Sequence, residues 1–223
     1  MTLISKNIII GSALAIFGFG QSALACDFVQ NSVDVESLSV TVDADLSDWE
    51  EVDFQKIEET CASCGELNSK DISAEFAVSV DQNNLYLVAV VMDDEVDING
   101  STKIFDLDGI EVMLDGFNNC SDTFYDDDMM LFVTADGRYQ FKGSQRATGR
   151  VEVATRIIED GYMIELSIPW QIVGSYPDEA PSMGFSISVN DRDGENREGQ
   201  YFWHYSNEHW KNPSEWASLH FLK

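Results

Sequence analysis

The sequence has few basic residues, few prolines and few cysteines, and its only long apolar run lies within the first 25 residues. Its 223 residues include 13 lysines and arginines against 40 aspartates and glutamates, so the formal net charge is −27 at pH 7. Such a surface repels phosphate backbones and anionic lipids, which argues against nucleic-acid and membrane partners. The missing second apolar run argues against a membrane span. No Gly-rich phosphate loop, G-x-S-x-G turn or Cys/His nucleophile constellation is present.

Hydrophobic residues are nevertheless plentiful. They make up 44% of the chain and aromatic residues 11%, which favours a packed core over the disorder that acidic composition alone would suggest. The length suits one well-buried domain. The excess of acids is typical of adaptation to saline surroundings, and it is also compatible with cation binding.

The first 25 residues resemble a secretory signal. Lys6 supplies the positive region, residues 8–19 are mostly apolar, and Ala23-Leu24-Ala25 offers a cleavage site. We therefore predict a signal peptide over residues 1–25 and a mature domain over residues 26–223, exported to the periplasm or secreted. A lipidated Cys26 is the alternative, and it is disfavoured because lipoprotein signals usually carry Leu where Ala23 stands.

Four cysteines remain after this cleavage. An even number in an exported chain predicts two disulfides with three possible pairings among Cys26, Cys61, Cys64 and Cys120. The Cys61-Ala-Ser-Cys64 spacing occurs in redox motifs, but no strand leading into a helix surrounds it. We interpret these cysteines as structural.

The dominant hydrophobic period is two, which predicts strands. Turn signals such as Asp136-Gly137 and Asp160-Gly161 separate the apolar segments. Helical turns are expected only at residues 55–59 and 170–173, and residues 50–71 are expected to form a long loop. The pattern predicts an all-β fold, an antiparallel β-sandwich of jelly-roll or immunoglobulin-like character. About ten short strands are expected, within residues 38–42, 76–80, 85–92, 110–114, 129–134, 139–142, 151–158, 162–168, 185–189, 201–204 and 216–221.

The order of these segments resembles the family 9 carbohydrate-binding module. The resemblance starts at Val42-Asp-Ala-Asp-Leu-Ser-Asp-Trp49, continues through Asp108-Gly-Ile-Glu-Val and includes Gly161-Tyr-Met-Ile-Glu-Leu-Ser-Ile-Pro-Trp170. It ends with the tail through Trp203, Trp210 and Pro213, so it covers nearly the whole mature chain.

This resemblance implies a β-sandwich that binds sugar, often with bound calcium. It predicts an exported, non-catalytic carbohydrate-binding protein that serves polysaccharide breakdown, with an oligo- or polysaccharide as partner. Characterised members clamp a sugar ring between two tryptophans. Residues 96–106, where the first is expected, contain Phe105 and no tryptophan.

Sugar sites combine an aromatic face with polar groups that bind hydroxyls. Residues 201–210 are rich in both, and we select Trp210, Trp203, Tyr205 and Asn207 as candidate carbohydrate-binding residues. Trp203 could equally be a core residue. Trp49 and Trp170 fall in strand-end motifs that favour the core.

Oxygen ligands at alternating positions suit a hard cation such as calcium. Asp191, Asp193 and Asn196 show this spacing around Gly194, without the closing Glu of an EF-hand. A solvated acidic loop is the alternative interpretation. The run at 126–128 and the run at 93–95 are weaker candidates of the same kind.

Two alternative functions remain at this stage. Glu111 and Glu165 are a conceivable glycosidase pair, although outward-facing strand positions explain them more simply. Related sandwich domains hold haem for electron transfer, and Met129, Met130 and Met163 are available as ligands.

Overall fold

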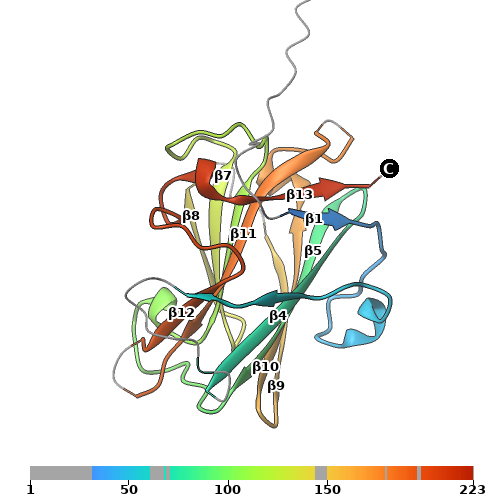
Figure 1. The fold of residues 1–223 in the computed structure, drawn as a ribbon. Coiled ribbons are helices and arrows are strands. Elements are labelled where there is room, and N and C mark those ends of the chain that lie inside the picture. Colours follow the sequence, from blue (N-terminus) through green and yellow to red (C-terminus); the bar gives the residue numbers. More distant parts are fainter. Residues whose placement is uncertain are drawn as a thin grey trace, which may run out of the picture.

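The computed structural model describes residues 32–60, 68, 71–143, 150–178, 180–194 and 197–222. Within these ranges thirteen strands form two sheets that pack on a shared hydrophobic core (Figure 1). Every strand pair is antiparallel except that of β1 with β13. The predicted all-β sandwich is therefore confirmed. No helix within these ranges is long and apolar enough to cross a membrane.

The larger sheet has the order β1-β13-β11-β6-β7-β8, with β12 beside β11 and β3 beside β12. Its strands are β1 (Ser32–Val35), β3 (Glu59–Thr60), β6 (Gly109–Asp115), β7 (Asp128–Thr134), β8 (Tyr139–Gly143), β11 (Ser182–Asp191), β12 (Gly199–Phe202) and β13 (Ala217–Phe221). We call it the large sheet.

The smaller sheet has the order β2-β4-β5-β10-β9. Its strands are β2 (Gln55–Ile57), β4 (Ile72–Val80), β5 (Asn84–Asp93), β9 (Glu152–Ile158) and β10 (Gly161–Pro169). The short helices are η1 (Leu46–Trp49), η2 (Ile104–Asp106), α1 (Trp170–Val173) and η3 (Pro213–Glu215). We call this sheet the small sheet.

The core lies between the sheets because alternate residues of each strand face inward. On β6, Val112 and Leu114 belong to the core, while Glu111 and Met113 lie on the opposite, outer face. The β9–β10 turn depends on Gly161, whose φ is 139°. A Cβ there would lie 2.0 Å from the carbonyl oxygen of Val91, so only glycine fits.

Two local predictions were wrong. Residues 38–42 alternate like a strand but form none, because their apolar side chains instead cover the outer face of the small sheet. Gln55–Ile57 is strand β2, paired with β4, and not a helical turn. The predicted long loop at 50–71 is accordingly interrupted by β2 and β3. The predicted helical turn at 170–173 is confirmed as α1.

Glu165 anchors the 43–49 segment on the outer face of the small sheet. It lies on the outer face of β10 and is fully buried, and its Oε2 accepts hydrogen bonds from the backbone N–H groups of Asp43 and Ala44, each at 2.8 Å. Its Oε1 accepts the indole N–H of Trp49, also at 2.8 Å. The outward orientation of Glu165 matches the prediction, but its carboxylate is a structural anchor beneath the 43–49 segment.

Candidate functional site

Two exposed aromatic rings border the outer face of the large sheet. Trp210 is 51% exposed on the turn after β12, and Phe105 is 39% exposed in η2. Phe105 packs on Phe132 of β7 with ring centroids 6.0 Å apart. The two rings thus come from connections far apart in the sequence, and both lie over the same sheet face.

Trp210 is held by contacts from two sides. Lys142 of β8 donates from Nζ to the Trp210 carbonyl at 2.6 Å, and the same Nζ lies 5.0 Å from the Trp210 ring centroid. The Trp216 indole N–H donates to the His209 carbonyl at 2.7 Å. These contacts fix the turn while leaving the Trp210 ring in solvent.

Glu111, Asn190 and Arg197 form a polar group on the outer face of the large sheet, which we call the polar floor. Glu111 of β6 is buried, accepts a hydrogen bond from the Asn190 amide at 2.9 Å and lies 3.7 Å from the guanidinium of Arg197. Arg197 also donates to the Phe105 carbonyl at 3.2 Å. Burial raises the pKa of Glu111, while Asn190, Arg197 and more distantly Lys142 oppose that rise. Glu111 therefore interacts with groups that hold both rings.

The other residues that the sequence suggests as sugar contacts lie in two different environments. Tyr205 and Asn207 share the connection that carries Trp210, and the Tyr205 hydroxyl donates to Asn207 Oδ1 at 2.7 Å. Asn207 is exposed. Trp203 is only 8% exposed and packs against Phe76 and Phe185 with centroids 5.5 and 5.7 Å away, so it lies in the core.

His209 stabilises the connection between β12 and η3 that carries Trp210. Its ring packs edge-on against Phe202 at 4.5 Å and lies 3.0 Å, through Nδ1, from the Ser206 carbonyl. Burial lowers the pKa of His209. The neutral ring therefore suits this position.

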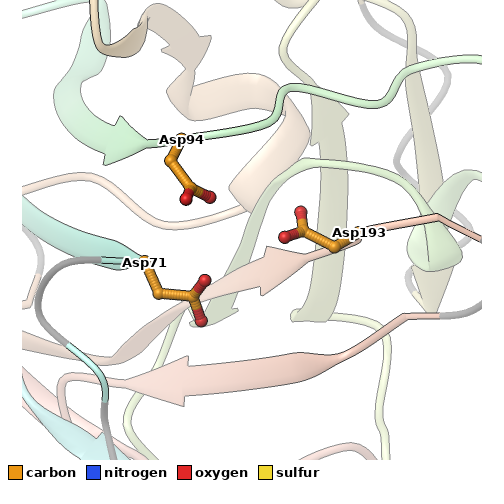
Figure 2. A group of neighbouring side chains, drawn as sticks. All are labelled: Asp71, Asp94 and Asp193. Atoms are coloured by element: carbon orange, nitrogen blue, oxygen red, sulfur yellow. The ribbon is translucent and has the colours of Figure 1, made fainter.

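A second kind of site lies at the end of the sandwich where β4 and β6 begin and β5 and β11 end. Asp71, Asp94 and Asp193 each place a carboxylate oxygen within 4.8 Å of the others. Figure 2 shows the three side chains, from three separate segments, turned toward a common space. The sequence-selected Asp193 belongs to this group.

Asp191, the other sequence-selected acid, belongs to a deeper group with Asp93 and Asp108. All three are buried, and one carboxylate oxygen each of Asp93 and Asp191 has no hydrogen-bond partner. Burial, followed by repulsion from Asp93, raises the pKa of Asp108 to about 8. Burial and neighbouring carboxylates raise the pKa of Asp191 to about 7 and that of Asp93 to about 6. Asn196 lies outside the described residues.

A third acidic group lies at the opposite end of β6. Asp115, Asp127 and Asp128 are buried and within the same 4.8 Å limit. One oxygen of Asp128 has no partner, although its other oxygen accepts the Tyr125 N–H at 2.6 Å. Burial and repulsion from Asp128 raise the pKa of Asp115 to about 7. Buried carboxylates with unsatisfied oxygens are the donor type that a hard cation uses.

Arg192 connects the acidic end to the loop that carries Phe105. Its guanidinium is 3% exposed, forms an ion pair with Asp97 at 3.0 Å and donates to the carbonyls of Gly100 and Asp106. The backbone N–H of Arg192 donates to Asp108 at 2.7 Å. The 94–108 connection is thus tied at both ends to the strand end that carries Asp191.

The alternative assignments receive no geometric support. Glu111 and Glu165 lie on the outer faces of different sheets, so the core separates them by more than the roughly 5–10 Å of a hydrolytic pair. Met129 is in the core, Met130 lies on the outer face of the large sheet and Met163 is in the small sheet, so they do not converge. Cys26, Cys61 and Cys64 lie outside the described residues, and the disulfide pairing stays a prediction, as does the signal peptide.

Sequence reasoning missed much of this arrangement. It selected Trp210, Asp191 and Asp193 as candidates, but not the floor residues Asn190 and Arg197 or the distant acids Asp71, Asp108 and Asp115. The sequence drew attention to Phe105 only because a tryptophan was expected in its segment and none is present there. Strand ends in the alternation could have pointed to Asp108 and Asp115, since each borders β6.

Comparison with known proteins finds a family whose profile matches most of the chain. The profile described as carbohydrate family 9 binding domain-like matches residues 42–223. The endo-1,4-beta-xylanase A proteins of Thermotoga neapolitana and Thermotoga maritima are 28% and 29% identical over 82% and 76% of this chain. The chain spans only 17% and 16% of their lengths.

Solved structures agree on the fold. The family 9 carbohydrate-binding module of Caldicellulosiruptor kristjanssonii, in complex with cellotriose, superposes with a TM-score of 0.76 at 22% identity. The match covers 86% of this chain and 93% of that one. A putative carbohydrate-binding protein from Bacteroides uniformis superposes with a TM-score of 0.60 at 12% identity, over 86% of this chain and 99% of that one.

Proposed function

The chain belongs to the carbohydrate family 9 binding domain-like family, and on this premise we propose that it is a non-catalytic domain that binds oligo- or polysaccharide. The observation that supports this most is the pair of exposed rings, Trp210 and Phe105, over the same sheet face as the polar floor. An aromatic face stacks on the C–H side of a sugar ring, while in-plane polar groups bind its hydroxyls.

Within the proposed site each group has a role. Trp210 is the main stacking platform and Phe105 the second. Asn207 offers an exposed amide beside Trp210, and Tyr205 orients that amide through its hydroxyl. Arg197, one third exposed and held by Glu111 and Asn190, is available for sugar hydroxyls from the floor. Trp203 supports the site from the core and is not assigned to the ligand.

Titration calorimetry with cellotriose and xylotriose tests this proposal. We expect saturable binding that Trp210→Ala reduces at least about tenfold, a loss of the size expected when a stacking contact is removed. Tyr176→Ala is the matched control, because Tyr176 is 38% exposed but lies after α1, away from both rings. An unchanged affinity in Trp210→Ala, or silence of the parent protein across a broad panel of oligosaccharides, would contradict the proposal.

We further propose that calcium occupies the acidic groups as a structural ion. All nine groups involved are carboxylates, and Ca²⁺ binds through oxygen ligands. The unpartnered buried oxygens of Asp93, Asp191 and Asp128 support this, because burying them without a partner is costly. Bound calcium would neutralise these clusters and fix the strand ends from which the 94–108 loop begins. Asn196 stays a candidate ligand beside Asp191 and Asp193.

The proposed setting is outside the cytoplasm. The signal-like residues 1–25 support export to the periplasm or the medium, where polysaccharide breakdown takes place. Residual enzyme activity of the purified chain on chromogenic glycosides would contradict the non-catalytic assignment.

A further inference from the structure

Basic side chains gather at the sugar site of an otherwise acidic protein. Four of the 13 lysines and arginines lie outside the described residues. Of the remaining nine, four border the two exposed rings: Lys103, Lys142, Arg197 and Lys211. Lys103 lies 5.8 Å from the Phe105 ring centroid, and Lys142 and Lys211 lie 5.0 and 5.4 Å from that of Trp210.

Two of these cations, Lys103 and Lys211, are each paired with a nearby acid. Lys103 forms an ion pair with Asp106 at 3.8 Å, and Lys211 pairs with Glu208 at 2.6 Å. Their charges are therefore largely balanced before any ligand arrives.

Lys142 is different. Its ammonium lies between the rings of Trp210 and Phe124, at 5.0 and 5.5 Å, and no carboxylate of the described residues lies within 4 Å of it. Burial lowers the pKa of Lys142, with Glu111 opposing this from a distance. In a chain with about three acids for every base, an exposed ammonium without an acidic partner is a position that suits an incoming anion.

Arg197 extends this positive character into the floor. It is one third exposed and 3.7 Å from Glu111, so the pair is a loose contact and not a tight bidentate bridge. Its other contacts are to neutral oxygens, Asn190 Oδ1 at 3.0 Å and the Phe105 carbonyl at 3.2 Å, so Glu111 is its one acidic partner among the described residues.

Resting on the proposed function, we propose that the preferred saccharide carries a carboxylate, as uronic acids do, and that Lys142 and Arg197 recognise it beside the Trp210 platform. A sugar stacked on Trp210 would bring a ring substituent close to Lys142. The carboxylate would then supply the acidic partner that the described residues do not provide.

The test compares pairs of sugars that differ only in this group. Glucose is compared with glucuronic acid, and cellotriose with the β-1,4-linked trimer of glucuronic acid, by titration calorimetry in 50 mM and 500 mM NaCl with calcium held constant. We expect the acidic trimer to bind roughly two- to fivefold more tightly at low salt, the range for an exposed charge pair. The ratio should shrink toward one at high salt because screening weakens the attraction.

Variants assign the preference to its residues. Lys142→Met keeps an apolar stem and removes the charge, so the ratio of the two affinities should fall toward the part that Arg197 supplies, whereas Lys142→Arg should keep the parent ratio. Lys56→Met is the matched control, because Lys56 is exposed on β2 of the small sheet, and it should leave the ratio unchanged.

Cellotriose binding at equal or higher affinity than the acidic trimer would overturn this inference and leave the proposed function standing. A preference for the acidic trimer that Lys142→Met leaves undiminished would overturn the assignment of Lys142. Failure of every neutral and acidic sugar to bind would overturn the proposed function itself.

Discussion

The carboxylate of Glu165 accepts the indole N–H of Trp49 at 2.8 Å, across 116 residues of sequence. The same carboxylate binds two backbone N–H groups of the 43–49 segment. Trp49 then completes a small apolar cluster with Ala77, Tyr86 and Val88 on the outer face of the small sheet. One buried acid thus closes the face of the sandwich that lies opposite the proposed sugar site.

Glu165→Gln should therefore destabilise the fold without touching the sugar site. The amide keeps one acceptor where the carboxylate offered two, and its NH₂ faces backbone donors, so we expect a loss of about 3 kcal/mol in the free energy of unfolding. Chemical denaturation at neutral pH measures this. Glu152→Gln, at the exposed start of edge strand β9, is the control and should stay within about 0.5 kcal/mol of the parent. An unchanged free energy of unfolding in Glu165→Gln would show that this anchor does not contribute to stability.

Removal of metal should lower stability and calcium should restore it. The buried groups of Asp93, Asp108 and Asp191 repel one another without a cation. At calcium 100-fold above its dissociation constant, the expected stabilisation is about 2.7 kcal/mol for each site. Thermal unfolding in EDTA, calcium and magnesium measures this, and Asp191→Asn should reduce the calcium effect. Identical curves in EDTA and calcium would contradict the proposed ion.

Arg192→Lys should weaken sugar binding although Arg192 lies outside the site. Lysine cannot reach Asp97 and the carbonyls of Gly100 and Asp106 at once, so the loop that carries Phe105 should lose its fixed position. We expect a three- to tenfold weaker affinity for the sugar that the parent binds, at unchanged binding stoichiometry. Arg156→Lys serves as the control, because its pair with Asp45 is exposed. Equal losses in both variants would contradict a specific role of Arg192.

His209 should make stability depend on pH. Its pKa is lowered in the fold by burial, so the unfolded state binds more protons near and below pH 6.5. The contribution of the neutral ring is therefore fully present above pH 6.5 and is lost as the pH falls through the folded pKa. The difference in unfolding free energy between the parent and His209→Gln, measured from pH 8 to pH 5 in excess calcium, should shrink as the pH falls. A constant difference would contradict this assignment.

The sheet framework could be predicted from the sequence because period-two alternation and Asp-Gly turns are local signals. Strands β5, β7, β9 and β10 all match the expected segments closely. The alternation at residues 38–42 misled because Val40 and Val42 bury their side chains on the back of a sheet without pairing in it. An apolar period reports which side chains are buried, and not whether the backbone pairs.

The sites were only partly predictable because they form where distant strands end together. Trp210 could be selected from its polar neighbours, and Asp191 and Asp193 from their spacing around Gly194. That these two aspartates belong to different groups depends on the register of β11 beside β6 and on the places where β4 begins and β5 ends. Arg197 and Glu111 meet for the same reason. Such juxtapositions are set by long-range pairing, which no local spacing encodes.

The indole resonances of the five tryptophans test the central claim most directly. Trp49, Trp170, Trp203 and Trp216 are buried and only Trp210 is exposed, so a nitrogen-15 spectrum gives one exposed reporter, with Trp49 and Trp170 as references away from it. Titration with cellotriose, xylotriose and the glucuronic acid trimer should shift the Trp210 signal in a saturable way, while those of Trp49 and Trp170 stay in place. A Trp210 signal that does not move with any of these sugars, or saturable binding that moves only other indoles, would contradict the proposed site.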